Sequence, residues 1–157
     1  MDAHDVAALT ILIGREPRAE CDVVVRDAED GILVIRNAPL MFDGTPMPTR
    51  FWLVGPVLVR RVSRLESGGG VRAAEAAVDV SELNRAHAEY AQERDRAIAP
   101  GYGGPRPSGG VGGTRRGVKC LHAHYAYWLA GGADPVGGWV AEALECGPPV
   151  SDPAGRS

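Results

Sequence analysis

The sequence predicts an α+β protein in which a small antiparallel sheet of about three strands packs with four or five helices. Short β-branched or aromatic runs gather before residue 55, and helically spaced apolar residues follow. The composition, 45% hydrophobic and 24% charged, is that of an ordinary globular protein. The length of 157 residues suits one core. We therefore expect a single α+β domain over 1–146 and a disordered C-terminal tail over 147–157.

The expected sheet begins with two short runs, residues 21–26 (CDVVVR) and 32–36 (ILVIR). The segment between them, DAEDG, is rich in turn-forming residues and ends in glycine, so the two runs predict a hairpin. The apolar run FWLV at 51–54 predicts a third strand, ended by a Gly-Pro pair. Ahead of the sheet, Asp5 as a cap and Gly14 as a stop predict a short helix.

Helices are expected after the sheet. The apolar spacing over 56–67 predicts a helix whose other side carries Arg60, Arg61 and Arg64, which we interpret as a solvent-exposed face. Three glycines end this helix, and the alanine-rich stretch 71–80 predicts either a short helix or a loose connection. Further helices are expected over 81–98, 117–131 and 134–146.

The helix over 81–98 has a charged residue within its apolar stripe. The stripe contains Leu83, Ala86, Tyr90 and Ala97, and the same sector holds His87 and Arg94. A buried unpaired charge is very costly, so Arg94 must meet a carboxylate or extend its guanidinium to water. The functional alternative is that Arg94 and His87 line a pocket for a phosphate or carboxylate ligand.

A positively charged, glycine-rich region follows this helix. Residues 97–133 contain no acid, whereas Arg106, Arg115, Arg116 and Lys119 are present. The run 109–113 (GGVGG) leads into the next helix, and exposed backbone N–H groups, a helix N-terminus and nearby cations are the ingredients of an anion site. The predicted anion-binding residues are Arg94, His87, Arg115, Arg116, Lys119 and His124. A flexible linker is the alternative, and the spacing is not that of a nucleotide P-loop.

The helix over 117–131 gathers sulfur and imidazole groups in an apolar segment. Its apolar stripe contains Leu121, Tyr125, Trp128 and Leu129. Cys120 and His124 are four residues apart, so on a regular helix they share a face and could be two zinc ligands, or a thiol beside a base. His122 would point to the opposite flank. The alternative is a buried cysteine near a hydrogen-bonded histidine.

Several segments resemble a known bacterial family. The segments DGTPMPTRFWLVGP, SRLE, AHAEYAQERD and KCLHAHYAYWLAGGADPVGGWV occur in this order and extend the likeness over about residues 14–144. Together they resemble the family called domain of unknown function 501. The resemblance implies a small cytoplasmic bacterial protein, often encoded near septum-formation and exopolyphosphatase genes, and implies no particular reaction. Relatives carry cysteine at the positions of Asp27 and Gly55, so a metal or thiol set that used those cysteines would be incomplete here.

The composition argues against two classes of protein, those that span a membrane and those that bind nucleic acid. No run of about 18–20 apolar residues is present, which argues against a membrane span, and the acidic N-terminus and odd cysteine count fit the cytoplasm. A net charge of −3 and few aromatic residues argue against nucleic acid. Three classes stay open: a protein that binds a phosphorylated or polyanionic small molecule, a metal or thiol protein built on Cys120, His124 and Cys21, and a protein-interaction module linked to cell division or polyphosphate metabolism. Whether the protein is an enzyme also stays open.

Overall fold

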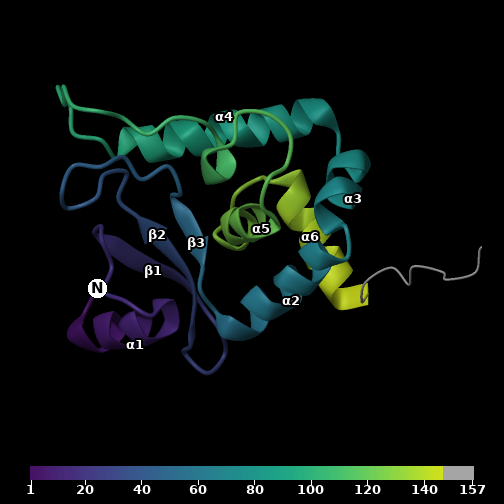
Figure 1. Cartoon of the computed structure of the whole chain (residues 1–157), viewed down its shortest axis with the longest axis horizontal. Coiled ribbons are helices and arrows are strands. Elements are labelled where there is room, and N and C mark those ends of the chain that lie inside the picture. The colour runs from purple at the N-terminus through teal and green to yellow at the C-terminus, as the bar shows by residue number, and fades with distance from the viewer. Residues whose placement is uncertain (147–157) are drawn as a thin grey trace, which may run out of the picture.

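The computed structural model of the chain describes residues 1–146. Its three strands are β1 Cys21–Arg26, β2 Ile32–Asn37 and β3 Phe51–Leu53, which form one antiparallel sheet in the order β1-β2-β3 (Figure 1). The register pairs Val34 with Leu53, and the β1–β2 pairing shifts register twice, between Val23 and Val25 and between Val25 and Arg26. The predicted α+β class with a small antiparallel sheet is confirmed. The predicted disorder of 147–157 lies outside the described residues.

Helix α1, Ala3–Ile13, comes before the sheet and ends at Gly14 in the left-handed conformation, as predicted. Its cap is Asp2, whose carboxylate accepts a hydrogen bond from the Asp5 backbone N–H at 2.9 Å. The prediction that Asp5 caps this helix is wrong, because the Asp5 side chain instead forms an ion pair with Arg26 of β1 at 2.8 Å. Asp5 therefore ties α1 to the sheet.

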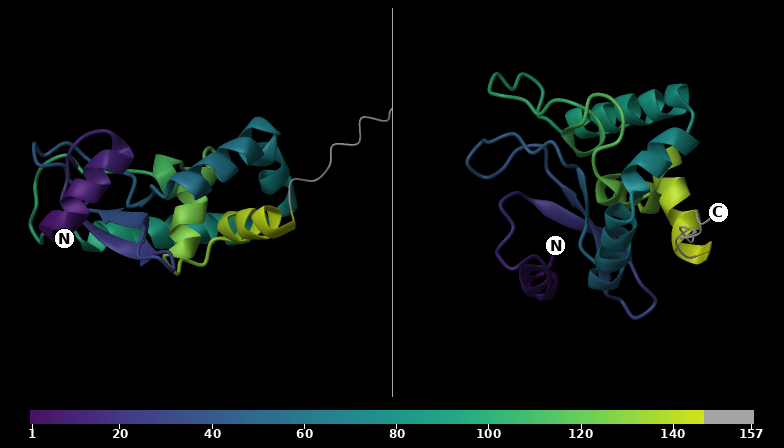
Figure 2. Two further views of the ribbon diagram at one scale, coloured as in Figure 1. Left: turned by 90° about the horizontal axis from the view of Figure 1, so that it is seen from below. Right: turned by 45° about the vertical axis from the view of Figure 1, so that its right-hand side comes forward.

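Five helices follow the sheet within the described residues. They are α2 Pro56–Ser67, α3 Gly70–Ala77, α4 Val80–Arg96, α5 Leu121–Leu129 and α6 Pro135–Cys146, and a short 3₁₀ turn, η1 Val111–Gly113, comes between α4 and α5. In Figure 1, α5 lies between the sheet and the group formed by α2, α3 and α6, and α4 runs along one side of all of them. Figure 2 shows the same order of parts from two further directions. No helix within 1–146 has the length and apolar character needed to cross a bilayer.

The main core surrounds α5. Leu121 and Ala126 are fully buried there against residues from β3, α2, α4 and α6, including Phe51, Val62 and Val140. A second, smaller apolar cluster lies between α1 and the sheet; it contains Leu9, Cys21, Ile32, Ile35 and Val54. The helix α5 thus joins the sheet, through β3, to the helices α2 and α6 by buried apolar contacts.

Three details of the predicted helices differ from the structure. Trp128, predicted in the apolar stripe, is 39% exposed, although it stacks on Tyr125 and lies beside Gly137 of α6. Ala97 is exposed and Ile98 is buried in its place, since α4 ends at Arg96 and the chain turns there. The segment 117–120 is not helical: Gly117 has φ of 66° and Cys120 has an extended backbone, so α5 begins at Leu121. This last difference decides which side chains can meet.

Candidate functional site

The glycine-rich loop is fixed to α4 by Arg94, whose side chain is only 1% exposed. Arg94 Nη1 donates to the carbonyl of Gly109 at 2.9 Å, with longer contacts to those of Pro48 and Ser108, and Nε donates to Asp95 Oδ1 at 3.0 Å. The buried guanidinium therefore binds backbone carbonyls and one carboxylate. The loop that reads as a linker is anchored at this point.

His87, two turns before Arg94 in α4, binds the same loop. Its Nδ1 accepts a hydrogen bond from the Val111 N–H at 3.1 Å, and its Nε2 lies 2.9 Å from the Gly117 carbonyl, to which it must donate. Burial lowers the pKa of His87, which keeps the ring neutral in this tautomer. Gly110 makes the close approach possible, because a Cβ there would lie 2.5 Å from the Cβ of His87. Both ring nitrogens of His87 are used by the fold.

His124 lies deep in the core and joins α5 to α6. Its Nδ1 is 2.7 Å from Asp134 Oδ2, while Asp134 Oδ1 accepts from the N–H groups of Val136 and Gly137 at the start of α6. His124 Nε2 is buried without a hydrogen-bond partner among residues 1–146. His87 and His124 face each other with ring centroids 5.6 Å apart. His124 therefore has Asp134 as its partner, and Cys120 has a different one.

The other predicted anion-binding residues, Arg115, Arg116 and Lys119, are exposed, and none has an ion pair in the part of the chain that the structure describes. Two carboxylates already bind the backbone beside them. Glu75 accepts from the Val118 N–H at 3.1 Å, and Glu66 accepts from the Leu121 N–H, the first of α5, at 2.8 Å. Glu66 thus supplies a negative charge to the helix N-terminus where the sequence predicts an external anion.

Glu66, Cys120 and His122 bring three donor atoms to one point, where the end of α2 meets the start of α5. One donor from each lies within 4.8 Å of the other two, and all three residues are half-buried. His122 Nδ1 is 3.1 Å from Glu66 Oε1 and 3.9 Å from Cys120 Sγ. Tetrahedral zinc with ordinary bond lengths separates nitrogen from oxygen by about 3.4 Å and nitrogen from sulfur by about 3.6 Å. The two distances at His122 differ from this spacing by about 0.3 Å each, so small side-chain shifts would let the three residues bind one ion.

The other nitrogen of His122 fixes the orientation of the ring. His122 Nε2 lies 3.1 Å from the Val59 carbonyl and 3.1 Å from Ser63 Oγ. A carbonyl can only accept, so Nε2 carries the hydrogen and the lone pair of the neutral ring is on Nδ1. Metal-binding histidines commonly donate their second nitrogen to a carbonyl in this way. Without a metal, the hydrogen bond with Cys120 and weaker contributions from the Val59 carbonyl and Glu66 outweigh burial and raise the pKa of His122 to about 9.

The same contacts argue against a serine nucleophile and against a triad in which Glu66 orients the imidazole. In a catalytic triad the nucleophile and the acid lie on opposite ring nitrogens, whereas Cys120 and Glu66 both approach Nδ1 of His122. Ser63 approaches Nε2, but its hydroxyl donates to the Val59 carbonyl at 2.8 Å, and Nε2 already carries a hydrogen. A metal centre needs donor atoms that surround one point, and the Glu66, Cys120 and His122 donors do so.

Of the three residues in this cluster, only Cys120 was predicted from the sequence as a metal ligand, and Glu66 and His122 were not. The sequence-based prediction paired Cys120 with His124, because it placed both in one helix, four residues apart. Cys120 instead has φ of −142° and ψ of 116° and precedes the helix, so its side chain turns toward α2 and His122. Glu66 lies far away in the sequence and carries no local signal for a role with Cys120. A cysteine and a histidine two residues apart at a helix start were the available hint.

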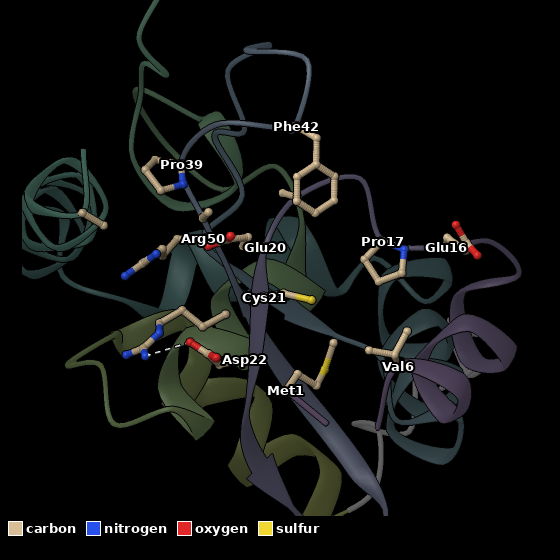
Figure 3. A pocket seen from close by; sticks show the side chains of 14 residues that line it. Met1, Val6, Glu16, Pro17, Glu20, Cys21, Asp22, Pro39, Phe42 and Arg50 are labelled. Atoms are coloured by element: carbon tan, nitrogen blue, oxygen red, sulfur yellow. Dashed lines mark hydrogen bonds and ion pairs between the residues drawn. The ribbon is translucent and has the colours of Figure 1, made fainter. Parts of the chain in front are cut away.

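A cavity of about 760 Å³ lies on the other side of the molecule, between α1 and β1 (Figure 3). The free thiol of Cys21 points into it, and burial raises the pKa of that thiol, which makes it a poor nucleophile. Its arginines are already paired: Arg36 lies 3.3 Å from Asp22, and Arg50 binds Glu93 at 2.8 Å. Cys120 does not line this cavity, so Cys21 is separate from the metal-ligand cluster.

Asp27 and Gly55, the two positions at which the resemblance led us to expect cysteine in relatives, line a common cavity with residues of α1. Cys120 is not among the residues around that cavity, so these two positions do not complete the cluster at α5. Neither the curated proteins nor the solved structures contain a match to the chain. A family model described as "Protein of unknown function (DUF501)" matches residues 23–142. Because that match covers most of the chain and includes every residue of the candidate site, the protein belongs to this family.

Proposed function

We propose that the protein binds one transition-metal ion, with Zn²⁺ as the best fit, through Glu66, Cys120 and His122. The observation that carries the proposal is the convergence of three donor atoms on one point while His122 Nε2 donates to the Val59 carbonyl. Sulfur, imidazole and carboxylate together favour zinc over magnesium or calcium. This is the metal alternative predicted from the sequence, with His122 in the place of His124.

Three protein ligands are the pattern of catalytic zinc, which keeps a fourth position for water or substrate. A zinc-bound water has a pKa of about 7, so the ion would supply a hydroxide nucleophile near neutral pH. Glu66 would also orient the start of α5, through its bond to the Leu121 N–H. We place the protein in the bacterial cytoplasm, where a thiol ligand such as Cys120 stays reduced.

The test is metal titration of the chelator-treated full chain. We expect one equivalent of Zn²⁺ to bind, and one equivalent of Co²⁺ to give a thiolate charge-transfer band in the near ultraviolet. Cys120→Ser should abolish that band, and His122→Gln or Glu66→Gln should weaken binding by about 10–100-fold or more. Cys146→Ser and Ser63→Ala are matched controls, because Cys146 is an exposed thiol elsewhere and Ser63 is not a ligand. Tight binding that survives Cys120→Ser would refute the proposal.

A second candidate function is binding of a phosphorylated or polyanionic small molecule, which the exposed cations Arg115, Arg116 and Lys119 support, since none of them has an ion pair among residues 1–146. Lys119 is next to the proposed ligand Cys120, and an anion could enter from this exposed segment. Arg94, His87 and His124 would act as the frame that holds the loop and α5, since the Arg94 guanidinium, both ring nitrogens of His87 and Nδ1 of His124 bind groups of the protein itself.

Thermal shifts with phosphate, pyrophosphate and polyphosphate test this second candidate. A ligand at a hundredfold excess over its dissociation constant stabilises the native state by about 2.7 kcal/mol. We expect the shift to be lost in the Arg115→Ala/Arg116→Ala/Lys119→Ala variant and kept in Arg72→Ala, which removes an exposed cation from α3. Equal shifts in both variants, or none in the unaltered chain, would remove this candidate.

A further inference from the structure

An apolar groove opens between α1, the β1–β2 turn and the start of α2, with a volume of about 550 Å³. Two of the most exposed aliphatic side chains of the described structure, Ile11 at 81% and Val57 at 59%, lie on its two sides. Ala8, Leu12 and Leu33 line the space between them. Water therefore contacts a continuous apolar strip rather than a single apolar side chain, which is the kind of surface that proteins use for association.

One wall of the groove is acidic. The turn between β1 and β2 contributes Asp27, Glu29 and Asp30, and all three residues line the groove. The cation beside them, Arg26, is bound by Asp5 at 2.8 Å and lies 3.6 Å from Asp30. Glu29 has no side-chain partner among residues 1–146. The turn thus keeps an excess of negative charge.

Beyond Val57, the exposed side of α2 is basic. Val57, Arg60, Arg61 and Arg64 follow one another at helical spacing on the exposed side of α2, over about 10 Å. The Arg61 guanidinium donates to the Leu144 carbonyl of α6. The side chains of Arg60 and Arg64 have no hydrogen bond or ion pair within the described residues. In Figure 1, α2 runs away from the β1–β2 turn, and Val57 lines the groove with the acidic turn whereas Arg60 and Arg64 do not, so the two arginines lie farther along α2 from the acids.

We infer that this surface binds a second copy of the chain in a two-fold symmetric dimer. A surface that is acidic at one end, apolar in the middle and basic at the other is complementary to itself when it is turned by 180°. The Ile11 and Val57 side chains of the two copies would pack at the centre. Each acidic turn would then face Arg60 and Arg64 of the other copy, and every contact would occur twice.

Sedimentation equilibrium of the full chain, at low and at high salt, tests the dimer. We expect a monomer–dimer equilibrium that weakens as salt screens the charged contacts. Ile11→Asp should abolish the dimer. Glu29→Arg and Arg64→Glu should each raise the dissociation constant by about tenfold, because each change places like charges together twice. The combined variant Glu29→Arg/Arg64→Glu should regain the dimer, since the two signs are then exchanged.

Arg72→Glu, on α3, is the matched control for a charge reversal and should leave the dissociation constant unchanged. Far-ultraviolet circular dichroism and melting temperature check that each variant is folded. A monomer at every concentration and salt level would overturn the inference, whether or not another protein binds the groove. A dimer that persists in Ile11→Asp, or charge reversals that the double variant does not rescue, would overturn it as well.

Discussion

At His122, the two ring nitrogens have different partners, and the ring can bind either a proton or a metal at Nδ1. The Val59 carbonyl keeps the hydrogen on Nε2, and Glu66 and Cys120 lie at Nδ1. A proton on Nδ1 forms a charged pair with Glu66, whereas a zinc ion would replace that proton and bind all three residues. Protons and metal therefore compete for the same atom.

The metal-free protein should lose stability between pH 6.5 and 9 through His122. Its pKa rises from 6.5 to about 9 on folding, so the protonated ring contributes its full stabilisation below pH 6.5 and loses it as the pH passes 9. We expect His122→Gln to lower the free energy of unfolding by about 1–2 kcal/mol at pH 6 and by much less at pH 9.5. Urea unfolding in the presence of a chelator measures this. A difference between the two proteins that does not change with pH would contradict the prediction.

Arg94 illustrates a charge that the fold uses internally. Arg94→Lys should lower the free energy of unfolding by about 2–3 kcal/mol, because lysine keeps the charge but cannot reach Asp95 and the Gly109 carbonyl together. Urea unfolding would show the loss. Arg96→Lys, at an exposed position on the same helix, should change the unfolding midpoint very little. Equal effects of the two substitutions would mean that the loop does not depend on Arg94.

The bounds of helices and strands agree with the prediction where nearby residues determine them. The β1 bounds and those of α2 agree with the predicted 21–26 and 56–67, because strand runs, turn residues and glycine stops act over a few residues. The start of α5 was predicted too early. Gly117 adopts a left-handed conformation, and the carboxylates of Glu75 and Glu66 hold Val118 and Leu121 from other helices. Such long-range bonds leave no periodic pattern in the sequence.

The glycine-rich loop should be sensitive to added volume where it touches α4. Gly110→Ala places a Cβ 2.5 Å from the His87 Cβ, so we expect a loss of about 1–3 kcal/mol in the free energy of unfolding. Thermal unfolding compares it with Gly103→Ala, where nothing lies within 4 Å of the added methyl group. If Gly110→Ala proves as stable as Gly103→Ala, then the loop is not packed on His87 in solution.

On the scale of the whole molecule, α5 is the shared wall of the sheet and the C-terminal helices, and the candidate metal site lies at its first turn. The sequence predicts the sheet, the helices and the importance of the segment after Gly117. It cannot predict that Glu66 lies beside Cys120 and His122, because the meeting of α2 with α5 depends on how whole helices pack. His87 and Arg94 were correctly expected in the apolar stripe of α4, and both are buried.

Zinc should protect both sides of this helix contact. We expect hydrogen exchange to slow in the C-terminal half of α2 and in residues 117–124 when the metal is added, since an ion bound to Glu66, Cys120 and His122 must hold both segments in place. Exchange in β1 should not change. Cys120→Ser should remove the protection, and protection spread evenly over the chain would point to a different binding site.

Cys120 stands just outside α5, and this position gives a bound metal a second effect. An ion shared by Glu66 and Cys120 would close a chain loop of about 55 residues that includes α3 and α4. A covalent crosslink over this span would cost the unfolded chain entropy worth about 4 kcal/mol, and a metal crosslink acts in the same sense while remaining reversible. The zinc supply of the cell would then change the fraction of the protein that is folded, in addition to any chemistry at the ion.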